Sequence, residues 1–565
     1  MTPTRALLAA AALAATGLSA AATPPAPPAA AARFEWFEYR GADPLPEAGS
    51  GEYRNPILQG FYPDPSITRA GDDYYLVTST FAWYPGLPVF HSRDLVNWTQ
   101  IGNALDRPDM LDFGTLGLSQ GVFAPAIEHH RGTFYIANTC VGCGGNFVIT
   151  ATDPAGPWSD PHWLPDLEGG IDPSLFFDED GRAWMINNGP PVGEPLYDGH
   201  RAIWIQEFDP QTLTTKGERT LLVNGGVDIS TEPVWIEGPH IYKVNGWYYL
   251  SAAEGGTAIN HSQVVLRSRT VTGPYEPWED NPYLTQRDLP ESRANPITSA
   301  GHADLVQLPD GSWWATFLAV RPYEGDYYNT GRETFLMPVD WSSGWPRITA
   351  PGEAIPYTRA KPNLPQQSAA ALPTSGPFTT RDEFDGPTLP LYWMMPRLPQ
   401  ERWYALSNGT LQLQPRPVAL GEPANPSFLA RRQQHLNAGA STLLSFDPQG
   451  QAEAGLAAFQ NENYWFALGL ARGPDGPVVR LRRRAGEEDP VGGTVLASAP
   501  LAIEPGAPIE LRVEARGPSY TFAYKVRAGE WQALGGDLDG RILSTRTAGG
   551  FVGAVFGPYA VANAP

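Results

Sequence analysis

A fivefold repeat constrains the fold of this 565-residue chain more than any other feature. Each copy has a glycine-containing turn followed by an aromatic-rich strand, and a short apolar strand precedes the turn as the first arm of a hairpin. The turn glycines lie about 50 to 65 residues apart, which is long enough for one propeller blade each. The repeat therefore predicts an all-β fold whose first part is a five-bladed β-propeller. The five turn-and-strand segments are residues 71–77, 132–137, 181–186, 246–251 and 311–316.

One position of the repeat carries the residues of greatest chemical interest. It lies about eleven residues before the aromatic anchor of each copy, where the first strand of the hairpin begins. In a propeller these strand starts surround one mouth of the central channel, so the five residues are expected to converge there. A single Asp-Pro pair is usually turn chemistry, but three carboxylic acids in one phase of a repeat are not explained that way. The five residues are Asp64, Ala124, Asp172, Glu237 and His302.

Three carboxyl groups held close together have pKa values that spread apart, because they cannot all ionise at equal cost. One group can then act as a general acid while another, still ionised, acts as a base or nucleophile. This is what glycoside hydrolysis requires. A metal site built from three acids and a histidine is the rival interpretation, although hydrolytic metal sites usually have more histidine ligands and this chain has 9 histidines in all.

The overall composition narrows the class of partner. The chain has 39 basic and 60 acidic residues, a formal net charge of −21, and no basic stripe, so nucleic acid is not an expected partner. The 59 glycines and 58 prolines disfavour long helices. A neutral polysaccharide is compatible with this charge. The sequence carries no indication of an oligomeric state.

The amino terminus predicts export. Residues 1–22 contain Arg5, an apolar run over 6–15 and small residues at 19–22, which is typical of a cleaved secretory signal peptide. Residues 23–50 are predicted to be a linker or N-terminal extension. We expect a soluble periplasmic or secreted protein with no membrane partner. Cys140 and Cys143 have no second cysteine pair for zinc, so a local disulfide or two inert thiols in a Gly-rich turn are the expected states.

The second half of the chain has a different pattern. We assign the propeller to residues 51–358 and a Pro-, Ala- and Ser-rich linker to 359–377. Period-2 alternation over residues 378–565 predicts a β-sandwich, closed by a strand over 550–556. We expect this domain to be mainly structural, with an independent carbohydrate-binding module as the alternative.

Several stretches in the first half resemble glycoside hydrolase family 43, the β-xylosidase and α-L-arabinofuranosidase family. They run in order and in phase with the repeat over about residues 53–347. The second half resembles the concanavalin-like, jelly-roll domain attached to many of that family's xylosidases, through Phe384-Asp385 and residues 550–553. The matching stretches in the first half are residues 55–67, 73–81, 84–86, 91–98, 123–125, 170–174, 236–239, 253–257, 301–302 and 331–334.

The resemblance implies an inverting mechanism and gives each acid a role. Asp64 would be the general base that activates water, and Glu237 the general acid that protonates the leaving oxygen. Asp172 would tune the pKa of Glu237 and orient it. The repeat selects these three positions independently, and the resemblance supplies the roles.

The resemblance also implies contacts to the sugar. Phe81 and Phe123 match aromatic walls of the pocket, although relatives often have Trp at the position of Phe123. Arg332 matches an arginine that hydrogen-bonds the terminal sugar, and Thr257 lies in a matching stretch and is a predicted contact. His302 matches a channel histidine that in relatives lies near the acids or holds calcium through water. No cofactor is expected to be required, and a structural calcium in the channel is a possible exception.

We therefore predict an exo-acting glycoside hydrolase that releases terminal β-D-xylose from xylan- or arabinoxylan-derived oligosaccharides. An α-L-arabinofuranosidase acting on arabinoxylan or arabinan is the alternative within the family, since the two activities share this scaffold. A carbohydrate-binding propeller without catalysis is the alternative of another class, and the intact set of three acids argues against it.

Overall fold

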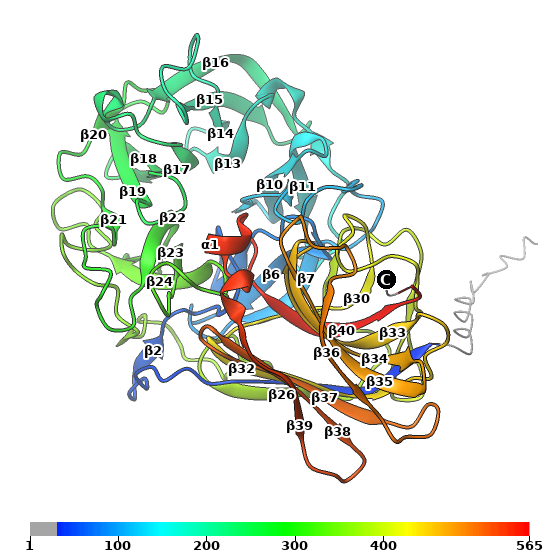
Figure 1. Cartoon of the computed structure of the whole chain (residues 1–565). Coiled ribbons are helices and arrows are strands. Elements are labelled where there is room, and N and C mark those ends of the chain that lie inside the picture. Colours follow the sequence, from blue (N-terminus) through cyan, green and yellow to red (C-terminus); the bar gives the residue numbers. More distant parts are fainter. Residues whose placement is uncertain (1–30, 564–565) are drawn as a thin grey trace, which may run out of the picture.

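The computed structural model describes residues 31–563 and consists almost entirely of β-strands. Five blades surround a central channel, and a β-sandwich packs against the propeller (Figure 1). The predicted fold class, a five-bladed β-propeller followed by a β-sandwich, is confirmed. The predicted signal peptide, residues 1–22, lies outside the described residues. No helix within residues 31–563 is both long and apolar enough to cross a membrane.

Each blade is an antiparallel sheet whose first hairpin strand lies nearest the channel. The predicted aromatic-rich strand is the second strand in every blade. Its buried side chains pack between neighbouring sheets. The strands of blades 1 and 2 are β3 (Ser66–Ala70), β4 (Asp73–Val77), β6 (Gly86–Ser92) and β7 (Thr99–Leu105), then β9 (Ala126–His130), β10 (Thr133–Val141), β11 (Gly145–Ala151) and β12 (His162–Trp163), with β8 (Gly121–Val122) paired to β10.

The remaining blades repeat this order. Blade 5 has three strands of its own. The strands of blades 3 to 5 are β13 (Ile171–Phe177), β14 (Ala183–Gly189), β15 (Ala202–Asp209) and β16 (Thr214–Asn224); β17 (Glu237–Val244), β18 (Trp247–Glu254), β19 (Ser262–Ser268) and β20 (Glu276–Pro277), with β21 (Leu284–Thr285) paired to β19; and β22 (Thr298–Gln307), β23 (Trp313–Val320) and β24 (Glu333–Val339).

The start of the propeller chain closes the ring against blade 5. Leu58 forms a β-bridge with Thr334 on β24. The Asn55 side chain donates to the Leu336 carbonyl at 2.9 Å and accepts from the Leu336 amide at 2.9 Å. β2 (Glu52–Arg54) pairs with β25 (Thr358–Ala360), so the two ends of the propeller segment are joined. Blade 5 therefore gains its outer contacts from residues that come first in the propeller.

The sandwich consists of two antiparallel sheets whose facing sides form its core. The first sheet contains β28 (Tyr404–Leu406), β29 (Leu411–Leu413), β1 (Ala32–Gly41), β32 (Asn437–Ser445), β37 (Ile509–Arg516), β38 (Ser519–Val526) and β39 (Gln532–Asp539), with β26 (Phe378–Asp382) on β1. The second contains β30 (Ser427–Phe428), β40 (Val555–Val561), β33 (Glu453–Asn461), β34 (Tyr464–Gly473), β35 (Gly476–Ala485) and β36 (Thr494–Pro500), with β31 (Arg431–Arg432) on β40.

The linker prediction for residues 23–50 is wrong for β1. This strand lies inside the first sheet of the sandwich, between β26 and β29 on one side and β32 on the other. Phe34, Phe37 and Tyr39 are almost completely buried, and the alternation of buried and more exposed residues shifts by one position between Phe34 and Trp36, where the strand register is irregular. The alternation is an ordinary amphipathic strand pattern. The chain therefore begins in the sandwich, makes the propeller, and then returns to complete the sandwich.

The propeller and the sandwich share one continuous apolar core. β5 (Trp83–Tyr84) of the propeller pairs with β27 (Met395–Pro396), which follows the predicted linker. The buried Arg397 donates to the carbonyls of Leu116 and Ala424, one in each domain. Such a shared core favours a fixed domain arrangement. In blade 2, Cys140 and Cys143 form a disulfide.

Candidate active site

A cavity of about 350 Å³ opens at one mouth of the propeller channel. This volume lies at the lower end of the ~300–1,000 Å³ range usual for small-molecule sites. All five residues of the repeat position line it, together with the four other predicted contact residues and four that the sequence analysis missed. The thirteen lining residues are Asp64, Phe81, Phe123, Ala124, Ile171, Asp172, Trp235, Glu237, Gly256, Thr257, His302, Arg332 and Phe551.

The backbone is unusual where the inner strands begin. Asp64, Asp172 and His302 have φ of 54°, 52° and 54°, in the left-handed region that few non-glycine residues adopt. Residues held in this region cost free energy and tend to occur at functional sites. In blade 4 the residue in this conformation is Gly238, with φ of 55°. A Cβ there would lie 2.7 Å from the His302 ring, so only glycine fits between Glu237 and that histidine.

Asp64 is buried and held from two sides. Ser79 donates its hydroxyl to Oδ2 at 2.5 Å, and Arg332 Nη1 donates to Oδ1 at 2.9 Å. The same Nη1 donates to Thr257 Oγ1 at 3.0 Å. These bonds orient the carboxyl group and fix the guanidinium beside it. Arg332 Nε is buried and has no hydrogen-bond partner among the described residues.

Glu237 has the protonation behaviour of a general acid. Burial raises the pKa of Glu237 to about 7, and the nearby Asp64 carboxylate adds to the rise, while Arg332 and Arg201 oppose it. Burial, followed by repulsion from Glu237 and Asp64, also raises the pKa of Asp172 well above its usual value. The Gly238 amide donates to Asp172 Oδ2 at 3.1 Å, which ties Asp172 to the backbone next to Glu237. Burial and mutual repulsion therefore favour the protonated forms of Glu237 and Asp172, and a protonated carboxyl group is what the general acid of glycoside hydrolysis requires.

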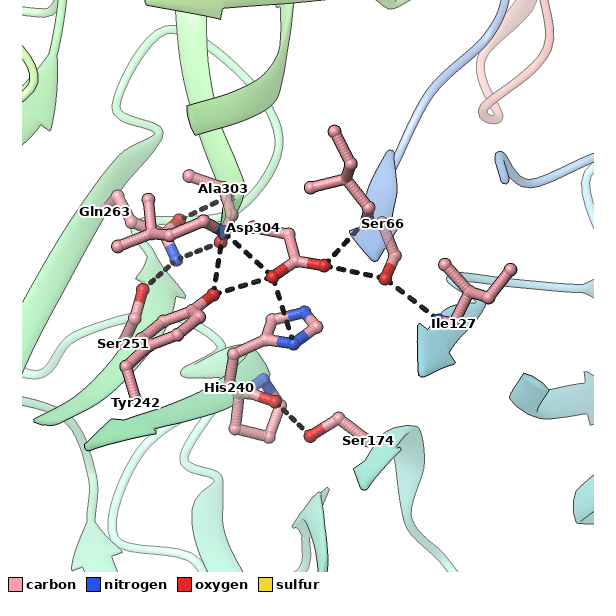
Figure 2. Close-up of polar contacts among 12 residues, drawn as sticks. Ser66, Ile127, Ser174, His240, Tyr242, Ser251, Gln263, Ala303 and Asp304 are labelled. Carbon is pink, nitrogen blue, oxygen red and sulfur yellow. Dashed lines mark hydrogen bonds and ion pairs between the residues drawn. The ribbon is translucent and has the colours of Figure 1, made fainter. Parts of the chain in front are cut away.

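A belt of polar contacts lies two residues further along the inner strands (Figure 2). Asp304 accepts hydrogen bonds from the Ser66 hydroxyl at 2.7 Å in blade 1 and from the Tyr242 hydroxyl at 2.7 Å in blade 4. Ser66 also accepts the Ile127 amide of blade 2 at 2.9 Å, and Ser174 donates to the Pro239 carbonyl between blades 3 and 4. These contacts connect neighbouring sheets that do not share a ladder. They fix the spacing of the inner strands next to the acids.

His302 lies at the pocket floor against Gly238. Burial lowers the pKa of His302 to about 4, so its imidazole is neutral at pH 7. Calcium takes six to eight oxygen ligands, whereas His302 offers a ring nitrogen. Within residues 31–563 no group of three or more His, Cys, Asp or Glu side chains is arranged to hold a metal ion. The residues around His302 do not fit an ion bound directly by the protein, and the water-mediated calcium stays a prediction.

Three phenylalanines form one wall of the pocket. Phe551 stacks on Phe81, with ring centres 5.7 Å apart and planes at 24°, and meets Phe123 edge-on at 5.6 Å. The Arg332 guanidinium lies over Phe551 at 5.3 Å and over Phe81 at 5.7 Å. Apolar rings beside a fixed charged group are typical of a ligand pocket. Phe551 belongs to the sandwich sequence, so both domains build the site.

The expected strand over residues 550–556 is wrong in its first part. β40 begins at Val555, and the preceding residues form a loop that reaches the propeller. The Phe551 amide donates to Ser119 Oγ at 2.8 Å, and a Cβ on Gly553 would lie 2.6 Å from the Thr330 carbonyl oxygen. Glycine is required at this contact because two backbones meet there. The loop therefore carries Phe551 into the pocket.

Of the four lining residues that were missed, Phe551 and Trp235 are the largest. Residues 550–553 did resemble the C-terminal domain of family 43, which in relatives packs on the propeller and can close one side of the pocket, but the resemblance does not single out Phe551 as a lining residue. Trp235 did carry a signal, since it lies two residues before Glu237 in the same segment. Ile171 likewise directly precedes Asp172, and Gly256 directly precedes Thr257.

Comparisons with known proteins agree with both halves of the chain. Residues 53–346 match the model of the glycosyl hydrolases family 43, and residues 381–565 match the beta xylosidase C-terminal concanavalin A-like domain. A non-reducing end alpha-L-arabinofuranosidase of Bacteroides ovatus is 38% identical over 90% of this chain and 92% of its own. A xylosidase/arabinosidase of Butyrivibrio fibrisolvens is 38% identical over 90% of this chain and 96% of its own.

A solved structure shows the same domain arrangement. The crystal structure of a GH43_12 protein retrieved from a capybara gut metagenome superimposes with a TM-score of 0.88. It is 41% identical and covers 94% of this chain and 99% of its own. The similarity therefore extends over the propeller and the sandwich together.

Proposed function

The chain belongs to glycosyl hydrolases family 43 and is a glycosidase, and from this membership we propose that it releases terminal β-D-xylose from xylan- or arabinoxylan-derived oligosaccharides. The observation that carries the proposal is the convergence of Asp64, Asp172 and Glu237 in one small cavity with an aromatic wall. A cavity of about 350 Å³ suits the end of a chain better than its middle. Exo-action on a terminal pentose follows.

The proposed reaction is a single displacement. The Asp64 carboxylate takes a proton from a water molecule whose oxygen forms a bond to the anomeric carbon. The bond from that carbon to the glycosidic oxygen breaks, and Glu237 gives its proton to the departing oxygen. The raised pKa of Glu237, about 7, supports the acid role. Asp172 is a positioning residue that holds the backbone beside Glu237 through Gly238.

Release of α-L-arabinofuranose is the second candidate. It is favoured by the Bacteroides ovatus relative, whose name is non-reducing end alpha-L-arabinofuranosidase. The two substrates both present a terminal pentose to the same acids, so the pocket wall decides between them.

The deciding experiment compares aryl β-D-xyloside with aryl α-L-arabinofuranoside under identical conditions, with NMR following the configuration of the first sugar released. We expect a higher kcat/KM on the xyloside and release of α-xylose, since one displacement inverts the β-bond. A preference for the arabinofuranoside would favour the second candidate. Release of the retained β-anomer would contradict the role given to Asp64.

Removal of the Phe551 ring should open the terminal pocket on the sandwich side. Because this ring stacks on Phe81 and lies under Arg332, we expect Phe551→Ala to lower kcat/KM on the preferred aryl pentoside by about tenfold or more, mainly through KM. Phe551→Leu, which keeps most of the apolar volume, should lose less. Thermal unfolding checks that both variants fold like the wild type. Equal kcat/KM in all three proteins would show that Phe551 does not contact the sugar.

We also propose that the protein is exported. The predicted signal peptide over residues 1–22 supports this, and so does the Cys140–Cys143 disulfide, since disulfides persist in oxidising compartments. Mass spectrometry of the protein from the producing cell would find its new amino terminus near residue 23 if the peptide is cleaved. An intact terminus on intracellular protein would contradict export.

A further inference from the structure

One half-buried arginine of blade 3 lies between the two chain segments that lead into Asp172 and Glu237. Arg201 directly precedes β15, and its Nη2 donates to the Gly169 carbonyl at 2.6 Å, three residues before Asp172. On its other side the guanidinium lies 4.8 Å from the centre of the Trp235 ring, two residues before Glu237. Arg201 therefore contacts the approach to both carboxyl groups.

Asn188 connects the same two segments. This residue of β14 is completely buried and pairs with Ile171, which lines the pocket. Its side-chain oxygen accepts from Arg201 Nη2 at 2.7 Å and from Nε at 3.0 Å. Its side-chain nitrogen donates to the Ile236 carbonyl of blade 4 at 2.6 Å, directly before Glu237. One amide group thus holds both the arginine and the backbone beside Glu237. Asn188 and Arg201 are called the clamp here.

The clamp has little room to shift. A Cβ on Gly170 would lie 2.6 Å from the Asn188 carbonyl oxygen, so the chain before the inner strand of blade 3 packs directly on β14. The Trp235 amide donates to the Gly199 carbonyl at 3.0 Å, two residues before Arg201. Both contacts hold backbone segments rather than flexible side chains. The clamp therefore fixes how blade 3 and the start of blade 4 meet beside the pocket.

The positive charge of Arg201 acts on the pocket from a distance. Within residues 31–563 this arginine forms no salt bridge. Burial lowers the pKa of Arg201, and the carboxyl groups of Glu237 and Asp172 oppose that change. Charges in a partly buried region interact over longer distances than charges in water. The two carboxyl groups of the pocket are therefore the main electrostatic partners of this guanidinium.

Charged and titratable groups of three other blades face the Glu237 carboxyl group. Two of them are cations, Arg332 and Arg201, and both oppose the rise in the pKa of Glu237 that burial and the nearby Asp64 cause. Arg332 is already bound to Asp64 at 2.9 Å, whereas Arg201 has no carboxylate in contact. The facing groups are Asp64 of blade 1, Asp172 and Arg201 of blade 3, and Arg332 and His302 of blade 5.

We propose that Arg201 is a positioning residue for the general acid, because it fixes the backbone before Glu237 and supplies the second positive charge that acts on its carboxyl group. Asn188 holds the guanidinium in place for both tasks. Without the charge, ionisation of Glu237 becomes less favourable, so the acid keeps its proton to higher pH. Without the hydrogen bonds, the segment before Glu237 can move, which slows reactions that need its proton. The inference rests on the proposed function, since it takes Glu237 as the acid.

Three substitutions separate the charge from the hydrogen bonds. Arg201→Met and Arg201→Gln remove the charge, whereas Arg201→Lys keeps it without the planar fork. In both neutral variants the alkaline fall of kcat/KM on xylobiose should move up by about 0.5 to 1 pH unit, less than for a cation in direct contact. All three variants should lose about 3- to 10-fold in kcat on xylobiose, yet stay within about twofold on β-D-xylosyl fluoride, whose leaving group needs no proton. Arg201→Lys should keep the wild-type midpoint.

Arg219→Met is the matched control. Arg219 also lies in blade 3, its guanidinium is 4.8 Å from the centre of the Trp204 ring, and burial lowers its pKa as it does that of Arg201. Its nearby charge is Asp166, which is outside the pocket lining, so this variant should keep the wild-type midpoint and rates. An unchanged midpoint in the neutral Arg201 variants would overturn the proposal. Equal losses on xylobiose and the fluoride, in any Arg201 variant that unfolds at the wild-type temperature, would do the same.

A titration without turnover separates the clamp from the proposed activity. In protein with isotope-labelled glutamate, NMR should find the Glu237 carboxyl signal, assigned by its absence from Glu237→Gln, titrating at about pH 7 in the wild type and higher in Arg201→Met. Equal midpoints in the two proteins would overturn the proposal whatever the enzyme's activity. A midpoint that shifts as expected, in an enzyme whose wild type releases no pentose, would instead contradict the proposed function alone.

Discussion

Replacement of Glu237 by alanine should lower hydrolysis of xylobiose by about 10³- to 10⁴-fold, the upper range for loss of general acid–base catalysis. The leaving sugar is a poor leaving group without a proton, and the pKa of Glu237, raised by burial to about 7, lets this residue carry that proton near neutral pH. Binding of xylose should change little, because the terminal sugar is expected to contact Arg332 and the phenylalanine wall. Steady-state kinetics and xylose inhibition measure both.

A substrate whose leaving group departs without a proton distinguishes the role of Glu237 as general acid from that of Asp64 as general base. The Glu237→Ala variant should hydrolyse β-D-xylosyl fluoride within about tenfold of the wild-type rate, since fluoride departs unprotonated. Asp64→Asn should lose about 10³-fold on both substrates, because neither reaction proceeds without an activated water. Equal losses on both substrates in Glu237→Ala would remove Glu237 from the acid role.

The pH profile gives an independent check on the same residue. A general acid must carry its proton, so wild-type kcat/KM on xylobiose should fall as the pH rises through about 7, where Glu237 ionises. The fall should approach tenfold per pH unit. With the fluoride this alkaline limb should be absent. A profile that stays flat to pH 9 on xylobiose would contradict the assignment.

Deletion of residues 1–41 should abolish folding of the sandwich. Phe34, Phe37 and Tyr39 of β1 are almost completely buried, and such side chains contribute about 1.5–3 kcal/mol each. Their summed loss, about 5–9 kcal/mol, is comparable to the whole free energy of unfolding of a domain, about 5–15 kcal/mol. The deletion also leaves β26 and β32 without their shared partner. We expect insoluble protein or a sandwich without a cooperative unfolding transition.

The matched control begins at residue 31 and keeps β1 whole. It should have the thermal unfolding midpoint and kcat/KM of the mature protein. A synthetic peptide of residues 31–45 added during refolding of the deleted chain should restore part of the activity. A chain that begins at residue 42 and unfolds at the same temperature as the control would show that β1 is dispensable.

The fold and the ring of acids could be predicted because both follow from a repeat. A residue at one phase of five blades must reach the same mouth of the channel, so Asp64, Asp172, Glu237 and His302 converge whatever lies between them. The roles of individual acids need more than phase. These roles depend on burial and on contacts between blades, such as the Arg332 guanidinium on Asp64 and the Gly238 amide on Asp172.

The missed features depend on contacts across long sequence separations. β1 has a period-2 pattern on each side of an irregularity between Phe34 and Trp36. Its partner strands begin at Phe378 and Asn437, and nothing in the local sequence identifies them. Phe551 follows two glycines with φ of 69° and 72°, which turn the chain out of the expected strand and toward Ser119. Trp235 lies two residues before Glu237 in the sequence, but its exposure and its contact with Arg201 are known only from the structure.

The position of Phe551 in the chain has a consequence for how the enzyme is made. Synthesis delivers Asp64, Asp172 and Glu237 early, whereas the ring that closes the pocket is residue 551 of 565. A nascent or truncated chain can thus hold every acid and still lack one wall. The loop that carries Phe551 directly precedes β40, which is the last strand of the second sheet in sequence order. The pocket is therefore complete only after the sandwich has docked on the propeller. Catalytic competence then follows the docking of the Phe551 loop on the propeller.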